Sequence, residues 1–290
     1  MARLGAGGMG EVYEAIDSRT QEHVALKVLK RWEPAQQIRF KREFRVLAQL
    51  RHENLVRPRE LVATDDCFFF TMDLCDGPNL VGHVRHEVEP GQLPNMIRLR
   101  RALRQLVAGV SALLSAGLLH RDLKPSNVLV TSYGLVRVLE FGLVRDVAAS
   151  DDITIEGQLV GTPAYMSPEQ SLATPATPAT DWYAVGTILY ELLTGERPFR
   201  GTLLQILSAK SEGPAPDPRA VVSSVPAELA SLTMSLMEVD PKQRPGATEI
   251  LEVLGVDAES DPVALELRHQ PLVGRQDEFA ALRAARAAAG

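Results

Sequence analysis

Short runs of hydrophobic residues alternate with polar ones in the first part of the chain, which is the spacing of half-buried strands. Strands are predicted within residues 11–30 and 61–74, because their apolar runs at 24–29 and 68–72 are rich in β-branched and aromatic residues. Between them, residues 36–50 have the spacing of an amphipathic helix. The apolar residues near one face of this helix are Ile38, Phe40, Phe44 and Leu47.

Beyond Asp76-Gly77-Pro78 the spacing of the hydrophobic residues becomes helical. One long helix is predicted to end at Gly117, since glycine accepts the backbone conformation that closes a helix. Its apolar residues are Leu99, Leu103, Leu106, Val110 and Leu113. Residues 181–193 are apolar almost all round, as in a helix buried inside a large domain. The pattern predicts an α+β protein with a small β-rich lobe at residues 1–75 and a larger helical lobe at residues 76–255.

Composition narrows the functional classes. With 290 residues, 45% of them hydrophobic, the chain can bury a sizeable core. Its formal net charge of −6 argues against a nucleic-acid-binding protein. Cys67 and Cys75 are too few for a disulfide framework or a zinc site, and no apolar run approaches the ~20 residues of a membrane helix. We expect a cytoplasmic protein with no membrane segment within this chain.

One short segment, residues 120–127 with the sequence H-R-D-L-K-P-S-N, combines the groups that phosphoryl transfer needs. Transfer from a nucleotide requires an acceptor for the hydroxyl proton, a cation for the phosphate and oxygen ligands for magnesium. Asp122 offers a carboxylate, Lys124 an ammonium and Asn127 a carboxamide. Glu140, which precedes Phe141 and Gly142, adds a second carboxylate.

This segment resembles the catalytic loop of protein kinases, H-R-D-L-x-x-x-N, and the resemblance covers about residues 4–255. It implies the two-lobed protein-kinase fold and transfer of the γ-phosphate of ATP to serine or threonine hydroxyls of proteins, including autophosphorylation, with Mg²⁺ as the metal. By resemblance, Asp122 accepts the hydroxyl proton, Lys124 neutralises the transferring phosphate and Asn127 binds magnesium. Lys124 and the later Gly161-Thr162 resemble serine/threonine kinases, and the chain as a whole is similar to those of bacteria.

A glycine-rich segment near the start matches the kinase form of G-x-G-x-x-G: Gly5-Ala6-Gly7-Gly8-Met9-Gly10. Glycines let backbone amides approach phosphates closely. The motif alone also fits a dinucleotide-binding turn. Here a second strand follows it instead of a helix, which favours the kinase interpretation.

Lys27 resembles the phosphate-binding lysine of the family, and an ordinary exposed strand lysine is the alternative. Glu43 lies on the apolar stripe of the predicted helix, where a carboxylate is costly unless paired, and Lys27 is its expected partner. A local Arg39–Glu43 pair is the alternative. Residues 72–75 resemble the hinge that contacts adenine. The resemblance implies a nucleotide site made of Leu4, Gly5, Gly7, Gly10, Val12, Ala25, Lys27, Glu43, Asp73 and Cys75.

Asn127 and Glu140 are the predicted metal ligands, but the family usually has aspartate where this chain has Glu140. Glutamate keeps the oxygen ligands on a side chain one methylene longer. A misplacement of about 1 Å can cost roughly 10²-fold in rate, so a slow kinase is expected. A nucleotide-binding pseudokinase that switches an attached module is the alternative. A small-molecule phosphotransferase is a third, against which the peptide-docking resemblance of residues 161–165 argues.

Several residues after the catalytic loop are expected to support it, by the same resemblance. Glu169 is expected to pair with Arg244. Asp181 is expected to hold the backbone of the catalytic loop, and a simple helix N-terminal acid is a compatible alternative. Thr154 is the expected phosphate acceptor of the activation segment.

Both ends of the chain look incomplete. Only Ala2, Arg3 and Leu4 precede Gly5, so the first strand of the sheet is expected to be truncated. Residues 256–270 have the character of a linker, and residues 271–290 resemble the start of an AAA-type ATPase module. A fused C-terminal ATPase or regulatory module is therefore a predicted partner.

Overall fold

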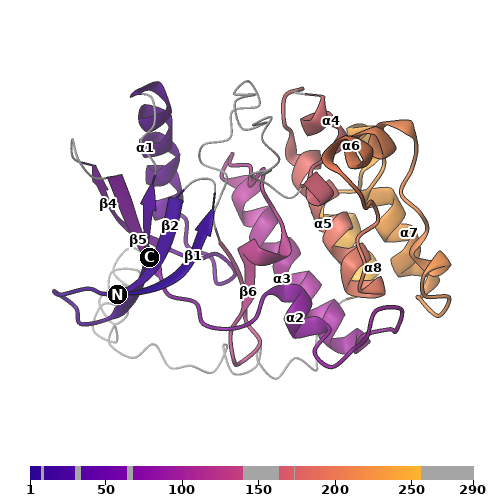
Figure 1. Cartoon of the computed structure of the whole chain (residues 1–290), viewed down its shortest axis with the longest axis horizontal. Helices are drawn as coiled ribbons and strands as arrows, with labels where there is room; N and C mark the ends of the chain where they lie inside the picture. The colour runs from indigo at the N-terminus through magenta and orange to yellow at the C-terminus, as the bar shows by residue number, and fades with distance from the viewer. Residues whose placement is uncertain (8–9, 30–33, 64–67, 140–162, 173, 256–290) are drawn as a thin grey trace, which may run out of the picture. The chain divides into compact units, whose positions relative to one another are not determined.

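A computed structural model describes residues 1–7, 10–29, 34–63, 68–139, 163–172 and 174–255. Residues 1–254 form one compact unit, with a sheet and one helix in its N-terminal lobe and mainly helices in its C-terminal lobe (Figure 1). Within the described ranges, no helix combines the length and apolar character needed to cross a membrane. The glycine-loop residues Gly8 and Met9, as well as Glu140, Thr154 and Gly161-Thr162, lie outside the described residues.

The N-terminal lobe contains a five-stranded antiparallel sheet in the order β1-β2-β3-β5-β4. The strands are β1 (Ala2–Gly7), β2 (Gly10–Ile16), β3 (His23–Leu29), β4 (Pro58–Ala63) and β5 (Phe68–Asp73). The strands predicted within residues 61–74 are β5 and the end of β4, which begins three residues earlier than expected. β1 pairs with β2 from Ala2 to Gly7, with a bulge between Arg3 and Gly5.

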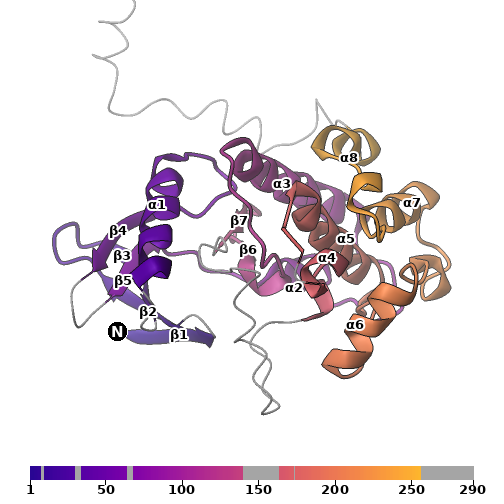
Figure 2. The same ribbon diagram turned by 90° about the horizontal axis from the view of Figure 1, so that it is seen from above.

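Helix α1 (Pro34–Gln49) lies beside β4 and β5 in both ribbon views (Figures 1 and 2). Burial alternates along β5, and aromatic side chains on its buried face meet the helix: the ring centroids of Phe40 and Phe68 are 5.3 Å apart, and those of Phe44 and Phe70 are 5.7 Å apart. The predicted stripe is confirmed for Phe40, Phe44 and Leu47, which are buried. The prediction is wrong for Ile38, which is 70% exposed because the sheet covers only one side of α1.

The C-terminal lobe is mainly helical, as predicted. Its α-helices are α2 (Leu80–Val84), α3 (Met96–Ser115), α4 (Pro168–Ser171), α5 (Pro178–Thr194), α6 (Leu203–Glu212), α7 (Ala227–Leu236) and α8 (Ala247–Leu254). It also has a hairpin of β6 (Val128–Val130) and β7 (Val136–Val138), and 3₁₀ turns η1 (Pro125–Asn127), η3 (Pro163–Tyr165), η4 (Pro218–Ala220) and η5 (Pro241–Gln243).

Two helices organise this lobe. The side chain of Asn95 caps the start of α3, and Gly117 follows its last turn with φ of +73°, the left-handed conformation predicted for it. Helix α5 is buried along nearly its whole length, which explains its uniformly apolar sequence. In the middle of α5, Gly186 lets α7 approach closely: a Cβ on this residue would lie 2.6 Å from Cβ of Leu236.

Backbone hydrogen bonds join the segment before β4 to the hairpin of the C-terminal lobe. The amide of Val56 donates to the carbonyl of Val138 (3.0 Å), and the amide of Val138 donates to the carbonyl of Asn54 (2.9 Å). The side chain of Asn54 is buried and donates to the carbonyl of Val136 (2.9 Å). These bonds fix the segment before β4 to β7, whose partner strand β6 directly follows the catalytic loop in the chain.

Candidate active site

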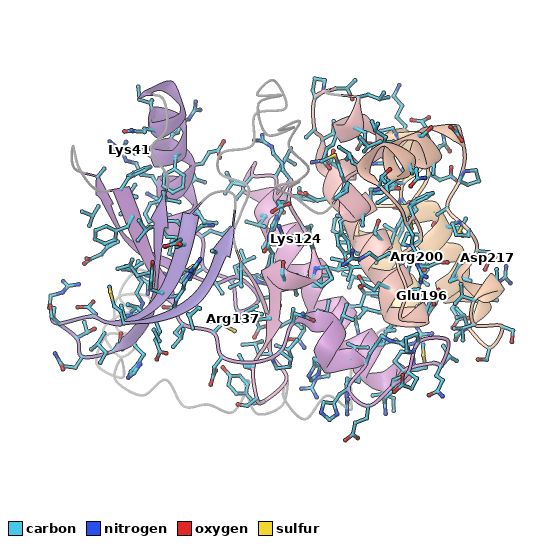
Figure 3. The ribbon with its side chains drawn as sticks, in the orientation of Figure 1. Lys41, Lys124, Arg137, Glu196, Arg200 and Asp217 are labelled. Atoms are coloured by element: carbon cyan, nitrogen blue, oxygen red, sulfur yellow. The ribbon has the colours of Figure 1, made fainter. Side chains whose placement is uncertain are left out.

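The catalytic loop, residues 120–127, brings its three predicted chemical groups together. Nζ of Lys124 lies 2.8 Å from Oδ2 of Asp122. Nδ2 of Asn127 donates to the main-chain carbonyl of Asp122 at 2.8 Å and lies 3.4 Å from Oδ2 of the same residue. The side chains of Asp122 and Lys124 are 13% and 22% exposed, so the ion pair is partly shielded from water and still open to a ligand. Figure 3 shows Lys124 within the helical lobe, to the right of the sheet.

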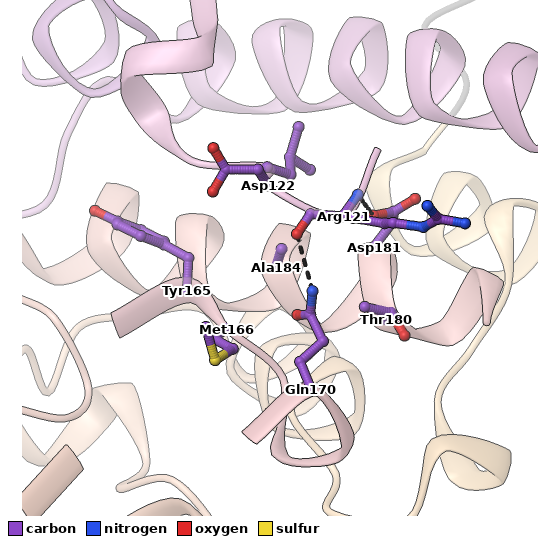
Figure 4. Close-up of a pocket in the computed structure, with 9 residues that line it drawn as sticks. Arg121, Asp122, Tyr165, Met166, Gln170, Thr180, Asp181 and Ala184 are labelled. Atoms are coloured by element: carbon purple, nitrogen blue, oxygen red, sulfur yellow. Dashed lines mark hydrogen bonds between the residues drawn. The ribbon is translucent and has the colours of Figure 1, made fainter. Parts of the chain in front are cut away.

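Asp181, in the first turn of α5, holds the backbone of this loop, as predicted. Its two carboxylate oxygens accept the amide hydrogens of His120 and Arg121, each at 2.8 Å. Figure 4 shows the bond from Arg121. Arg121 has φ of +63°, a conformation that costs free energy in a non-glycine residue and persists only when its surroundings fix it. Burial raises the pKa of the Asp181 carboxyl, while the charge of His120 and the two amide donors oppose that rise.

Two further contacts fix the loop from either side. Nε2 of Gln170, on α4, donates to the carbonyl of Arg121 at 2.9 Å, drawn as a dashed line in Figure 4. A ring nitrogen of His120 lies 2.9 Å from the carbonyl of Leu139, just before the undescribed Glu140. The loop geometry therefore depends on α4 and α5 and on the strand that leads towards the predicted metal ligand.

A pocket opens beside Asp122. Its walls come from the catalytic loop, from η3 with the residue after it, and from α4 and α5; the lining residues are Arg121, Asp122, Leu123, Tyr165, Met166, Gln170, Thr180, Asp181 and Ala184. In Figure 4, Asp122 lies on one side of the pocket, with Met166 and Gln170 on the other. A small side chain that entered here would come close to the carboxylate of Asp122.

The glycine loop has the backbone freedom that its sequence predicts at Gly10. This residue has φ of +147°, and a Cβ built on it would lie 1.9 Å from the carbonyl oxygen of Val28, so only glycine fits. At Gly5 nothing lies within 4 Å of a built Cβ. Gly7 is the β1 partner of Gly10 in the antiparallel pair. The three glycines therefore differ: Gly10 is required by the sheet, whereas Gly5 borders open space.

Lys27 is buried on β3, at 4% exposure, which excludes the ordinary exposed lysine. Glu43 is half-buried on α1, next to the buried Phe44, as the amphipathic pattern predicted. The Lys27–Glu43 pair stays a prediction. So does the alternative partner of Glu43, because the side chain of Arg39 lies outside the described residues.

The hinge residue Asp73 is more firmly bonded than its sequence suggested. Its amide donates to the carbonyl of Arg57 at 3.0 Å. Its carboxylate accepts a hydrogen bond from Nε of Arg59 at 2.7 Å, and Nη2 of Arg137 lies 3.7 Å away. The amide of Asp73 is thus committed to the protein, and an adenine contact at this residue would have to use another backbone group.

The remaining predicted nucleotide contacts lie on the sheet and the hinge. Ala25 is buried at 5% exposure, Val12 is half-buried against the core, and Leu4 is 51% exposed on β1. Cys75 is half-buried, and burial raises the pKa of its thiol, so it remains protonated near neutral pH. These four side chains offer mostly apolar surface to a bound base.

The predicted metal site includes one residue, Glu140, that lies outside the described part of the chain. Among the described residues, no group of three or more His, Cys, Asp or Glu side chains could hold a metal ion. Asn127 uses its Nδ2 for Asp122, which turns the carboxamide so that Oδ1 is the atom available as an oxygen ligand. The donor chemistry of Asn127 fits Mg²⁺, and its predicted partner Glu140 lies outside the described residues.

The predicted Glu169–Arg244 pair is confirmed. Two nitrogens of Arg244 lie 2.7 and 2.8 Å from the two carboxylate oxygens of Glu169, and the Arg244 side chain is fully buried. Thr180 also donates to Glu169 at 3.0 Å. Burial opposes ionisation of Glu169, but its hydrogen bonds with Arg244, Thr180 and the backbone, together with the charge of Arg244, keep its pKa below the ordinary value.

Two polar residues of the C-terminal lobe, Gln170 and Lys210, were not singled out in the sequence. Gln170 acts through the carbonyl of Arg121, which is distant in the chain, so no local spacing reveals it. Lys210 is buried on α6, four residues after the buried Ile206. That helical spacing placed Lys210 on the apolar face and was the one available signal.

Comparisons with known proteins identify the family of the chain. The family model described as the protein kinase domain matches residues 1–254. The serine/threonine-protein kinase PknL of Mycobacterium tuberculosis is 35% identical over 270 residues, which cover 92% of this chain and 65% of PknL. The DNA damage-responsive serine/threonine-protein kinase RqkA of Deinococcus radiodurans is 34% identical over 279 residues, covering 95% of this chain and 41% of RqkA.

A solved structure gives the same result for the fold. The crystal structure of Rad53 residues 1–466 in complex with AMP-PNP has a TM-score of 0.68 and 25% sequence identity. The match covers 86% of this chain and 62% of that one. The chain thus spans less than two thirds of PknL, RqkA and the Rad53 structure that it matches.

Proposed function

Because this chain belongs to the protein kinase family, we propose that it is an ATP-dependent protein serine/threonine kinase. The observation that carries the proposal is the convergence of Asp122, Lys124 and Asn127 within one loop, with Lys124 2.8 Å from the carboxylate of Asp122. The bacterial relatives PknL and RqkA are named serine/threonine-protein kinases, which supports the same substrate class.

The reaction assigns one task to each group. A serine or threonine hydroxyl enters beside Asp122, and its oxygen forms a bond to the γ-phosphorus of ATP while the bond to the ADP oxygen breaks. The hydroxyl proton passes to the carboxylate of Asp122. Lys124 neutralises the transferring phosphate next to that carboxylate, so the acceptor and the phosphate are held at the same point. The products are a phosphorylated protein and ADP.

ATP and Mg²⁺ are the cofactors of this proposal. Asn127, through Oδ1, and Glu140 would hold the metal, which supplies charge compensation for the phosphates when it is bound. Lys27 and the glycine loop would bind the phosphates, and the hinge at residues 72–75 would bind adenine. The AMP-PNP complex of the structurally similar Rad53 supports the nucleotide assignment.

The pseudokinase alternative has no observation in its favour among the described residues. Its motivation was Glu140, whose longer side chain would misplace the metal, and that residue lies outside the description. The pocket beside Asp122 and the bonds that fix the catalytic loop are both features that catalysis needs. A small-molecule phosphotransferase is disfavoured because η3, which resembles a peptide-docking segment, forms a wall of that pocket.

One experiment tests the proposal. ATP radiolabelled on the γ-phosphate is incubated with the protein, Mg²⁺ and casein as a generic substrate with serines and threonines. We expect labelled phosphoserine or phosphothreonine with the natural protein, and a loss of at least ~10²-fold in rate for Asp122→Asn. Affinity for a fluorescent ATP analogue should be largely unchanged in the variant, since Asp122 is not among the expected ATP contacts.

Asp240→Asn is the matched control, because Asp240 is an exposed aspartate whose side chain caps η5 elsewhere in the same lobe. It should retain the natural rate. Nucleotide binding without any transfer by the natural protein would favour the pseudokinase. Full activity of Asp122→Asn would show that the catalytic loop has been assigned wrongly.

Two further parts of the proposal concern the surroundings of the kinase domain. We place the domain in the cytoplasm, since the reaction needs ATP.

We also propose that residues 256–270 are a linker and that residues 271–290 begin a further ATPase-like module. Expression of the chain with its downstream coding sequence, followed by limited proteolysis, should release a kinase fragment that ends near residue 255. Cleavage at no site near this residue would contradict the domain boundary.

A further inference from the structure

Lys210 is a buried cation beneath the pocket that the proposed kinase would use for its protein substrate. It lies on α6 at 1% exposure. Its Nζ donates to the carbonyls of Pro163 and Ala164, each at 2.8 Å, and also to the carbonyl of Met166. An ammonium has three N–H donors, so all three are used on one short backbone segment. We call this segment, residues 163–166, the docking turn.

Aromatic rings complete the surroundings of this ammonium. Nζ lies 5.3 Å from the ring centroid of Tyr183, on α5, and 5.8 Å from that of Phe199. Burying an ammonium is costly unless its donors are satisfied, and here three carbonyls and two ring faces provide the compensation. Within the described part of the chain, the hydrogen-bond acceptors of Lys210 are all main-chain carbonyls, and no carboxylate pairs with it. Its charge therefore acts on the backbone of the docking turn instead of on a carboxylate.

The docking turn is also part of the pocket beside Asp122. Tyr165 and Met166, which it contains, both line that pocket. Lys210 is absent from the lining and reaches the substrate side only through these carbonyls. Loss of the Lys210 ammonium would therefore shift the pocket wall that faces an incoming substrate. It would leave the Asp122–Lys124 ion pair in place, because that pair belongs to the catalytic loop.

We propose that Lys210 is a positioning residue for the protein substrate: its ammonium fixes the docking turn and thereby sets the affinity for the peptide, and not for ATP. The inference rests on the proposed kinase function and deepens it. A purely structural lysine would instead stabilise the lobe and affect both substrates alike. The two roles differ in how the KM values for peptide and for ATP respond.

Arg85 offers a matched control. It is also a buried cation of the C-terminal lobe that donates to main-chain carbonyls, those of Leu192 (2.8 Å) and Gln92 (3.0 Å) among them. It has no contact with the docking turn among its hydrogen bonds in the described part of the chain. Arg85→Met and Lys210→Met therefore remove comparable interactions, at different distances from the pocket.

The experiment measures KM and kcat with a serine-containing peptide substrate, together with KM for ATP and the melting temperature. For Lys210→Met we expect the peptide KM to rise by about 10-fold or more, since small misplacements of a binding wall have effects of this size. The KM for ATP should stay at its natural value, and Lys210→Arg should recover part of the loss. Arg85→Met should lower the melting temperature without changing the peptide KM.

Hydrogen exchange separates this inference from the proposed function. In Lys210→Met, amides of residues 163–172 should exchange faster than in Arg85→Met, whether or not the protein transfers phosphate. If neither the natural protein nor the variants transferred phosphate, the kinase function would be rejected. The hydrogen-exchange rates would still report on the docking turn.

Three results would overturn the inference. One is an unchanged peptide KM in folded Lys210→Met. Another is an equal rise in the KM values for peptide and ATP. If Lys210→Met does not fold, the milder Lys210→Gln takes its place. The third overturning result is that both variants fail to fold while Arg85→Met folds, since Lys210 would then support the whole lobe.

Discussion

Burial decides what individual charged residues can do in the helical lobe. Burial lowers the pKa of Lys210 from 10.5 to about 7, so this lysine can change its charge near neutral pH. The neighbouring groups keep their charge states near neutral pH. Burial raises the pKa of the Tyr183 hydroxyl. Arg244 is paired with Glu169, and its guanidinium lies 4.9 Å from the Tyr183 ring centroid. On η3, Tyr165 donates a hydrogen bond to Glu191, and burial raises its pKa as well.

The pKa of Lys210 leads to a pH prediction with opposite signs for stability and for substrate binding. Between pH 7 and 10.5 the unfolded chain binds this proton and the folded chain does not, so the contribution of Lys210 to the free energy of unfolding rises with pH in this window. A neutral amine has two N–H donors in place of three, so the docking turn loses a bond and the peptide KM should rise over the same range.

The measurement compares the natural protein with Lys210→Met from pH 6 to pH 9. The difference between them in the free energy of unfolding isolates the contribution of Lys210 from those of other titrating groups. We expect the peptide KM of the natural protein to rise with pH and that of the variant to stay level. Peptide KM values that run parallel in the two proteins would contradict the prediction.

At the scale of helices, one glycine allows two of them to pack. Gly186 lies in the middle of α5, where replacing glycine by alanine would ordinarily stabilise a helix by about 1 kcal/mol. Here the new methyl group would lie 2.6 Å from Cβ of Leu236 and 2.9 Å from Cγ of Met237. We expect Gly186→Ala to lower the free energy of unfolding by about 1–3 kcal/mol, because overpacking forces the helices apart.

Gly82 provides the control for this prediction. It is exposed on α2, and an added methyl group would meet its nearest neighbours at 3.5 Å, an ordinary contact distance. Gly82→Ala should leave stability unchanged or raise it by up to about 1 kcal/mol. Denaturant unfolding of both variants checks the pair, and similar midpoints for the two would show that α5 and α7 have room to adjust.

The same scale shows what the sequence could predict. Helices α3 and α5 were predictable because one buries a regular stripe and the other buries its whole surface, and both patterns are local. Glu169, Asp181 and Arg244 were predictable through the resemblance, which carries pairings between distant segments. Lys210 was not, because its partners lie more than 40 positions away and the family motifs do not include it.

At the scale of the whole kinase unit, a carboxylate at the hinge interacts with arginines of both lobes. Asp73, at the end of β5, accepts a hydrogen bond from Arg59 of β4 at 2.7 Å, and Arg137 of β7 in the C-terminal lobe lies 3.7 Å away. Arg137 also donates to the main-chain carbonyl of Glu53 at 2.7 Å. One carboxylate therefore lies between an arginine from each lobe, beside the predicted adenine site.

Removing this charge should loosen the relation between the lobes. In Asp73→Asn the two arginines no longer share a carboxylate, and the two lobes, which both contact ATP in the proposed function, are held less firmly. Because these side chains are about one quarter exposed, the effect should be modest: a rise of about 3- to 5-fold in the KM for ATP, of the order expected for a partly exposed pair worth up to ~1 kcal/mol.

Salt distinguishes this electrostatic effect from a local disturbance of the hinge. Raising the ionic strength screens a partly exposed pair, so the KM for ATP of the natural protein should approach that of Asp73→Asn as sodium chloride is added. Glu60→Gln is the control, since Glu60 pairs with Arg19 at 2.8 Å on the exposed surface of the N-terminal lobe alone. It should behave like the natural protein at every salt concentration. If Asp73→Asn keeps the natural KM for ATP at low salt, the charge at the hinge does not couple the lobes, and the backbone bonds between Val56 and Val138 would carry that connection instead.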